Sequence, residues 1–157
     1  MSATIDWKKV KIYAISILIP VAAGALIGLI TSRSMDYDAL QKPALAPPPV
    51  LFPIVWSLLY VLMGVSYGML KSQKLTDTAV NAVYYAQLGV NLLWPIFFFV
   101  LKWRLFAFIW ILLLAALVIA MTVLFYRRHR TAGLLQLPYA AWTVFASYLN
   151  LFIVLLN

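Results

Sequence analysis

The chain contains five continuous apolar runs, each about twenty residues long. A helix needs roughly 20 apolar residues to cross the hydrocarbon core of a bilayer, whereas a strand of a membrane barrel shows roughly 10 residues of alternating polarity. The runs predict spanning helices at residues 10–30, 50–70, 79–101, 105–125 and 134–156. We therefore expect an all-α fold, in which residues 1–157 form a single five-helix transmembrane bundle.

The composition leaves no room for an additional soluble domain. Hydrophobic residues make up 66% of the chain and charged residues 10%, whereas soluble domains carry about 25% charged residues. The first apolar run is too long for the core of a signal peptide and lacks a convincing cleavage site, so we expect it to remain as a helix.

The basic residues predict the orientation of the chain. One set of connections holds Lys8, Lys9, Lys11, Lys71, Lys74, Arg127, Arg128 and Arg130; the opposite set holds Arg33, Lys42, Lys102 and Arg104. Because cytoplasmic segments are enriched in Lys and Arg, we expect the N-terminus inside and the C-terminus outside a bacterial cell membrane. The net charge of +8 then faces anionic lipid headgroups, and no nucleic-acid partner is expected.

The residue types exclude several kinds of chemistry. The chain has no Cys and no Glu, its only His is His129, and its four Asp lie in the N-terminal tail or in connections. A metal site and a carboxylate pair for acid–base catalysis are therefore not expected, and no cofactor is required. Because no ionisable residue lies in the middle of a span, an ion-coupled pump is also disfavoured.

The connection at residues 31–49 is the longest and contains Pro43 and Pro47–Pro49. Proline fixes the backbone φ angle and lacks an N–H donor, so an ordered, non-helical cap is one interpretation. A plain linker is the other. The remaining connections are short enough to be simple turns.

Three spans carry aromatic and amide side chains at helical spacing, which places them on one face of each helix. The stripes are Trp56, Tyr60, Met63 and Tyr67; Tyr84, Gln87, Asn91, Trp94 and Phe98; and Tyr139, Trp142, Ala146 and Asn150. Buried amides and indoles need hydrogen-bond partners. The stripes therefore line a ligand pocket or serve as hydrogen-bonding contacts between helices.

Small residues recur at a spacing of four, which allows close approach of helix backbones. The pairs are Gly24 with Gly28, Gly64 with Gly68, and Ala82 with Ala86. They predict tight packing either within the bundle or between the two copies of a homodimer.

Motifs along the whole chain resemble the TspO family of tryptophan-rich sensory proteins, also called translocator proteins or peripheral-type benzodiazepine receptors. Lys42-Pro43, Pro47-Pro48 and the segment from Phe52 to Tyr60 resemble the first loop and second helix of that family. The segment Gln87-x-x-x-Asn91-x-x-Trp94 is similar to the motif in the third helix of the family. Two further segments, Leu137-Pro138-Tyr139-x-x-Trp142 and Ala146-x-x-Leu149-Asn150, are similar to the motifs in its fifth helix.

The resemblance implies a five-helix protein, commonly dimeric, that binds porphyrins, haem-related tetrapyrroles, sterols or benzodiazepine-type ligands. It implies a pocket between helices on the outer side, under a lid formed by the first loop. Together with the stripes, it assigns the pocket to Trp56, Tyr60, Gln87, Asn91, Trp94, Tyr139, Trp142 and Ala146, and the lid to Tyr37, Lys42 and Pro43.

The chain departs from the family pattern in the lid and at the sterol motif. Asp36 stands where the family often has Trp, and Ala44-Leu45 replaces aromatic residues, so the lid side is less aromatic. No Lys or Arg follows Tyr148, which argues against cholesterol as the natural ligand, although Leu124–Arg128 fits the loose sterol pattern.

These observations favour a membrane receptor or sensor that binds a tetrapyrrole or a similar flat hydrophobic molecule and regulates or facilitates its movement. One alternative is an enzyme that degrades porphyrins in light and oxygen, in which Trp56 and Trp142 take part. Another is a structural membrane protein without a ligand.

Overall fold

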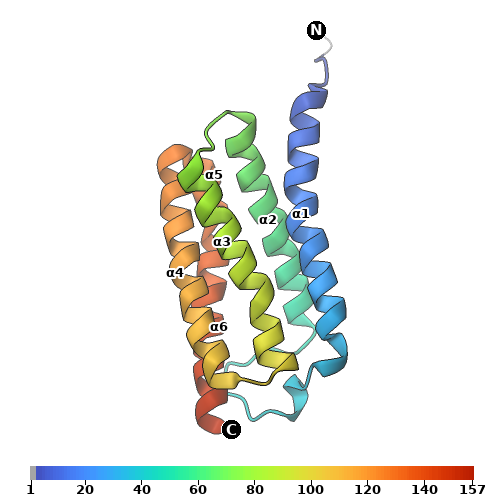
Figure 1. Cartoon of the computed structure of the whole chain (residues 1–157), viewed down its shortest axis with the longest axis vertical. Coiled ribbons are helices and arrows are strands. Elements are labelled where there is room, and N and C mark those ends of the chain that lie inside the picture. Colours follow the sequence, from blue (N-terminus) through green and yellow to red (C-terminus); the bar gives the residue numbers. More distant parts are fainter. Residues whose placement is uncertain (1–2) are drawn as a thin grey trace.

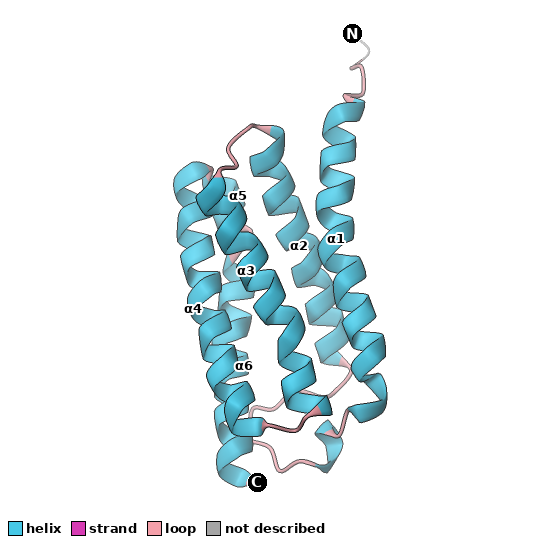
Figure 2. Ribbon diagram, viewed as in Figure 1, coloured by secondary structure: helices cyan, strands magenta, loops and turns pink. Residues whose placement is uncertain are grey.

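A computed structural model describes residues 3–157, which form a bundle of long helices (Figure 1). The α-helices are α1 (Trp7–Thr31), α2 (Leu51–Ser72), α3 (Thr78–Pro95), α4 (Arg104–Arg128), the short α5 (Arg130–Leu134) and α6 (Leu137–Leu156). Three further turns are η1 (Ser32–Ser34), η2 (Tyr37–Ala39) and η3 (Ile96–Val100). Loops lie at the two ends of the bundle (Figure 2).

The predicted all-α architecture with five spans is confirmed. Five segments are long and apolar enough to cross a membrane, namely Trp7–Ser34, Leu51–Ser72, Thr78–Val100, Arg104–Arg128 and Arg130–Leu156. No strand occurs between residues 3 and 157. The chain is an integral membrane protein associated with the lipid bilayer.

Two connections contain more helix than the sequence predicts. The prediction that all short connections are simple turns is wrong for residues 129–136, because α5 forms there before α6 begins. The side chain of His129 accepts a hydrogen bond from the backbone N–H of Ala132 at 3.4 Å and so caps α5. The connection at residues 31–49 includes the 3₁₀ turns η1 and η2, so it is not wholly non-helical.

Local chemistry explains where helices begin and change. Asp6 caps α1 by accepting from the N–H of Lys8 at 3.1 Å, and Asp77 caps α3 by accepting from the N–H of Val80 at 2.9 Å. Both carboxylates satisfy donors that a helix N-terminus leaves unpaired. At Pro95, which lacks an N–H, the α-helix gives way to the π-helical turn η3.

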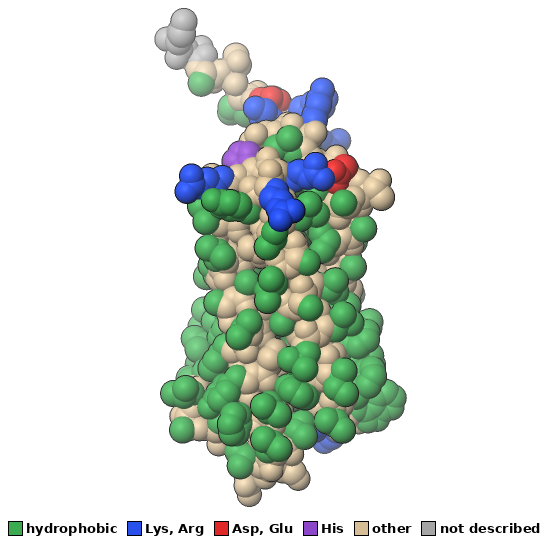
Figure 3. All heavy atoms as spheres, turned by 90° about the vertical axis from the view of Figure 1, so that its left-hand side faces the viewer, with side chains coloured by type: hydrophobic (Ala, Val, Ile, Leu, Met, Phe, Trp, Pro, Cys, Tyr) green, Lys and Arg blue, Asp and Glu red, His purple; other side chains and the backbone are tan. Residues whose placement is uncertain are grey.

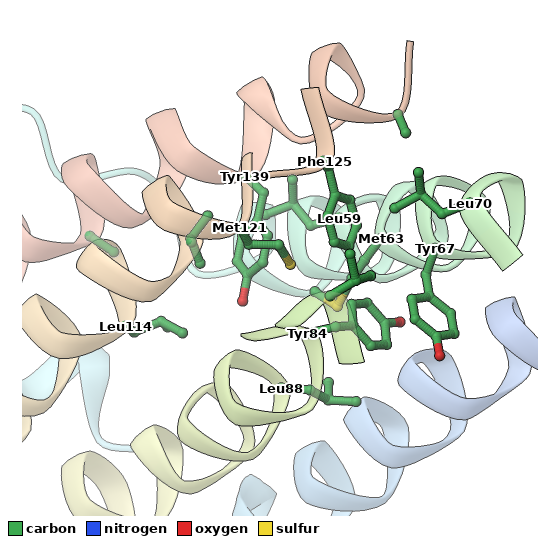
Figure 4. Close-up of a cluster of buried hydrophobic side chains, with 14 of the residues drawn as sticks. Leu59, Met63, Tyr67, Leu70, Tyr84, Leu88, Leu114, Met121, Phe125 and Tyr139 are labelled. Carbon is green, nitrogen blue, oxygen red and sulfur yellow. The ribbon is translucent and has the colours of Figure 1, made fainter. Parts of the chain in front are cut away.

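The core lies between the helices, which neighbour one another in the pairs α1–α2, α3–α4 and α4–α6. Its centre is a cluster of buried apolar and aromatic side chains (Figure 4). The rings of Tyr67 on α2 and Tyr84 on α3 are stacked with their centroids 4.2 Å apart. This contact joins two spans through aromatic packing in addition to burial.

Glycines on α2 allow α1 to pack closely against it. A Cβ atom on Gly64 would lie 2.4 Å from the Cα of Ile17, and one on Gly68 would lie 3.0 Å from the ring of Tyr13. A Cβ on Gly24 of α1 would lie 2.3 Å from the ring of Tyr60. The absence of side chains at Gly24, Gly64 and Gly68 therefore allows the close contact between α1 and α2.

The other small residues do not pack inside the bundle. A Cβ on Gly28 would have no neighbour within 4 Å, and Ala82 and Ala86 are exposed on the outer face of α3. Packing by these three residues within one copy of the chain is therefore not observed.

Charged side chains gather mainly at the end of the bundle near the N-terminus, beyond a broad apolar face (Figure 3). Each end also contains an ion pair. Arg128 contacts Asp77 at 2.7 Å at the end near the N-terminus, and Arg104 contacts Asp36 at 2.7 Å near the opposite end. The apolar band between the two ends is the surface that contacts lipid.

Replacing Gly64 by Ala is expected to lower the thermal unfolding midpoint in detergent. The added methyl group would meet helix backbone, which cannot move aside without separating α1 from α2, at a cost of ~1–3 kcal/mol. Gly28→Ala is the matched control, because its Cβ enters open space. Equal midpoints for the two variants would contradict close packing at Gly64.

Candidate ligand-binding site

Four of the predicted site residues form one hydrogen-bonded network in the interior. The hydroxyl of Tyr60 on α2 donates to Oδ1 of Asn91 on α3 at 2.7 Å. Nδ2 of Asn91 donates to the hydroxyl oxygen of Tyr139 on α6 at 2.6 Å, and the Tyr139 hydroxyl donates to Oε1 of Gln87 at 2.7 Å. The network therefore connects three spans.

Burial makes this network important for the fold. Gln87 is 0% exposed, Tyr139 1% and Asn91 3%. An unpaired amide in an apolar interior costs several kcal/mol, so each partner holds the others in place. Nε2 of Gln87 donates to Sδ of Met63 at 3.4 Å, and a thioether sulfur is a weak acceptor. The amides thus act as interhelical contacts, and they also place polar groups deep in the bundle.

Trp56 lies over two tyrosines of the network. Its ring centroid is 5.8 Å from that of Tyr60 on the same helix and 6.3 Å from that of Tyr139 on α6. The interplanar angle with Tyr139 is 76°, an edge-to-face arrangement. Aromatic rings therefore fill the space between α2 and α6 just beyond the hydrogen-bonded network.

Among the aromatic residues predicted for the pocket, Trp142 differs because its buried polar atom has no partner. Its indole Nε1 is buried and makes no hydrogen bond. The ring lies edge-on to Phe52 of α2, at 5.9 Å, and near Phe145, at 5.6 Å. A buried indole N–H normally finds an acceptor, so this donor is available to a molecule that enters between α2 and α6.

Trp94 belongs to a different contact between α3 and α6. Its Nε1 donates to Oδ1 of Asn150 at 3.2 Å, and its ring stacks on Phe98 at 4.8 Å. Asn150 in turn donates to the backbone carbonyl of Ala146 at 2.7 Å. Trp94 and Ala146 are therefore linked to each other through Asn150, while Trp94 makes no hydrogen bond to the network around Tyr139.

The first connection folds over this end of the site as an ordered lid, which we define as residues 32–50. The Tyr37 hydroxyl donates to the carbonyl of Pro47 at 2.9 Å, and its ring contacts Phe52 at 5.0 Å. The Lys42 ammonium donates to the carbonyls of Tyr37, at 2.8 Å, and Leu40, at 3.1 Å. The amine of Lys42 thus binds lid backbone. Pro43 accepts from the N–H of Ala46 at 3.1 Å, closing a turn.

Two long-range contacts hold the lid against the bundle. Nη2 of Arg104, at the start of α4, donates to both carboxylate oxygens of Asp36 at 2.7 and 2.9 Å. The side chain of Asn157 accepts from the N–H of Gln41 at 3.1 Å and donates to its carbonyl at 2.9 Å. The lid is therefore fixed to the start of α4 and to the C-terminus.

The environment of Asp36 keeps this carboxylate ionised. Partial burial by itself would raise its pKa, but the hydrogen bond and charge of Arg104, together with the charge of Lys102, lower the pKa below its ordinary value. The guanidinium of Arg104 also lies 4.3 Å from the centre of the Phe98 ring. The ion pair is thus joined to the aromatic contacts of η3.

Sequence reasoning missed three groups that the structure brings to the site. Phe52 stands between the lid and Trp142, Asn157 binds the lid, and the Asp36–Arg104 pair joins residues 68 positions apart. Phe52 lies four residues before Trp56, so the helical spacing of that stripe was an available signal. The other contacts have no local pattern. In residues 3–157 no group of three His, Cys, Asp or Glu side chains could hold a metal ion.

Replacing Asp36 by Asn is expected to loosen the lid. Removing a partly exposed ion pair should raise amide hydrogen-exchange rates of residues 35–46 about two- to fivefold at pH 7, after correction for intrinsic rates. Because the folded pKa is lowered, the contribution of the pair is present at neutral pH and is lost as pH falls through that pKa. The exchange rates of wild type should then rise toward those of the variant as the pH falls below about 4. Asp38→Asn, an exposed neighbour, serves as control, and equal exchange in both variants would contradict the tether.

Comparison with known proteins identifies the family. A sequence model of the TspO/MBR family matches residues 16–156. The chain is 40% identical over 145 residues to the tryptophan-rich protein TspO of Archaeoglobus fulgidus, covering 90% of this chain and 94% of that protein. It is 35% identical to protein CrtK of Rhodobacter capsulatus, covering 93% and 92%, and 36% identical to the human translocator protein, covering 73% and 70%. With five spans and the motifs of helices two, three and five in order, the chain belongs to the TspO/MBR family of membrane proteins.

Proposed function

We propose that this protein is a membrane receptor or sensor that binds a tetrapyrrole, or a similar flat hydrophobic molecule, between α2, α3 and α6 beneath the lid. Relatives carry the names tryptophan-rich sensory protein, in Cereibacter sphaeroides, and translocator protein, in human. These names support a role in sensing a molecule or in facilitating its movement.

The observation that carries the proposal is the unpaired indole N–H of Trp142. In a membrane interior this donor has no water to bind, so leaving it without an acceptor is costly. A carbonyl or carboxylate at the edge of a ligand would satisfy it. The neighbouring rings of Phe52 and Trp56 offer flat apolar surfaces for the body of the same ligand.

Entry of a ligand requires the aromatic side chains between α2 and α6 to separate. Tyr37 of the lid contacts Phe52, and Phe52 contacts Trp142, so opening of the lid and of this gap are mechanically linked. The Tyr60–Asn91–Tyr139–Gln87 network lies beyond the rings and would form the polar floor of the site. Such a site binds and releases a ligand without ion coupling.

Protoporphyrin IX is expected to quench the tryptophan fluorescence of the detergent-solubilised protein in a saturable manner. Trp142→Phe should weaken binding about tenfold, because it removes the hydrogen-bond donor but keeps an aromatic ring. Fluorescence titration of wild type and variant shows whether quenching saturates and gives the dissociation constant of each.

Trp7→Phe is the matched control for this experiment. Trp7 is 71% exposed and is the first residue of α1, whose start lies at the end of the bundle away from the lid (Figure 1). Its replacement should leave the dissociation constant unchanged. Quenching that does not saturate, or equal affinities in the Trp142 and Trp7 variants, would reject the proposed site.

We further propose that the N-terminus faces the cytoplasm of a bacterial cell, which places the lid outside. The support is the distribution of basic residues: eight Lys and Arg flank the spans on the N-terminal side, against four on the lid side. A ligand would then reach the site from the outer surface of the membrane.

A homodimer formed through the outer face of α3 is the arrangement that we propose for this chain in the bilayer. Ala82, Ala86 and Gly89 are exposed there and would allow two α3 helices to approach closely. In this cysteine-free chain, Ala86→Cys should give a disulfide-linked dimer under mild oxidation in membranes. Ile109→Cys on the lipid face of α4 should remain monomeric; equal cross-linking of both variants would contradict this interface.

A further inference from the structure

An apolar groove of about 270 Å³ opens on the outer surface of the bundle, far from the lid. Its volume is many times the ~10–15 Å³ that a cavity needs, on the same measure, to hold one water molecule. The groove lies between the last turns of α4, the short helix α5 and the start of α6. Its lining residues are Thr122, Val123, Tyr126, Arg127, Gly133, Leu134 and Leu137.

Packing fixes the shape of this groove. A Cβ on Gly133 would lie 2.4 Å from the Cα of Tyr126, so the absence of a side chain there allows α5 to rest directly on α4. The Ser66 hydroxyl on α2 donates to the carbonyl of Ala132 at 2.6 Å and anchors α5 from its other side. The groove is therefore held by close backbone packing and a buried hydrogen bond.

The walls of the groove are suited to a hydrocarbon chain. Val123, Tyr126, Leu134 and Leu137 are each 44–51% exposed and face outward from the bundle. At the floor, the Thr122 hydroxyl donates to the carbonyl of Val118 at 2.7 Å, so its polar atom is satisfied by its own helix. An acyl chain in the groove would bury apolar surface without leaving a polar group unpaired.

Two arginines stand at the mouth of the groove. Arg127 lines it, and the Arg130 guanidinium lies over the Tyr126 ring, 5.9 Å from the ring centroid. Their neighbour Arg128 is paired with Asp77 at 2.7 Å, whereas no carboxylate in residues 3–157 lies within 4.0 Å of Arg127 or Arg130. The mouth therefore offers two cations that can bind an external anion.

We propose that this groove binds one anionic phospholipid from the leaflet at the N-terminal end of the bundle. An acyl chain lies between Val123 and Leu134, and the phosphate pairs with Arg127 and Arg130. Guanidinium groups bind phosphate oxygens through charge-assisted hydrogen bonds, and an anionic lipid complements a rim that has no acidic residue of its own. This site is separate from the one beneath the lid.

Retention of lipid by the full-length protein tests the proposal. The protein is purified in detergent with equal amounts of phosphatidylglycerol and phosphatidylcholine that have the same acyl chains, and bound lipid is measured by native mass spectrometry. Wild type should retain phosphatidylglycerol preferentially. In the double variant Arg127→Gln, Arg130→Gln, the ratio of bound phosphatidylglycerol to bound phosphatidylcholine should fall about five- to tenfold, because the two groups that pair with the phosphate are gone.

The matched control is Lys71→Gln, Lys74→Gln, which removes the same charge at the same end of the bundle but outside the groove. It should keep the preference for phosphatidylglycerol. Leu134→Trp, which fills the groove, should reduce retention of that lipid even though both arginines remain. Thermal unfolding confirms that each variant is folded.

Three results would overturn the proposal. One is equal retention of the two lipids by wild type. Another is an equal loss of the preference for phosphatidylglycerol in the arginine and lysine double variants, which would show that the lipid is attracted to the basic end of the bundle without a specific site. The third is preferential retention of an added sterol that the Leu134→Trp change abolishes while phosphatidylglycerol retention is unaffected.

Discussion

Hydrocarbon offers no hydrogen bonds, so a bundle in a bilayer must pair its buried polar groups internally. In this protein one network does so for side chains of three spans: Tyr60, Asn91, Tyr139 and Gln87 connect α2, α3 and α6. The Tyr139 hydroxyl both accepts from Asn91 and donates to Gln87. Because each amide depends on that hydroxyl, a shift of α6 relative to α3 would leave two buried groups unpaired. The relative placement of three spans is thus linked to hydrogen bonding at a single side chain.

Against this background the indole N–H of Trp142 is informative. Trp94 has an acceptor in Asn150, whereas Trp142, two helical turns earlier on α6 than Asn150, has none. Both indoles lie between spans, but only Trp94 has a polar side chain from a facing helix within hydrogen-bond distance. A donor that the protein leaves unpaired next to aromatic rings, beneath an ordered lid, is consistent with the ligand site that we propose.

The two ends of the molecule use charge differently. Near the lid, Asp36 neutralises Arg104 and fixes a loop to the start of α4. At the other end, Arg128 is paired with Asp77, while the arginines beside the α4–α5–α6 groove face no acid in residues 3–157. The first arrangement stabilises the protein's own structure, and the second leaves positive charge available to the anionic surface of the membrane.

Much of this architecture could be predicted from the sequence, because a bilayer imposes a fixed length and polarity on each span. The apolar runs determined five helices, the charges determined which residues lie at the ends, and the spacing of four placed Gln87 and Asn91 on one face of α3. Helical periodicity fixes faces within a helix, but it does not fix the rotation and axial offset between helices. Only the tertiary structure therefore decided that Tyr139 bridges both amides and that Trp142 lacks an acceptor. It also decided that Asp36 meets Arg104, 68 positions away in the sequence, and that a groove opens beside α5.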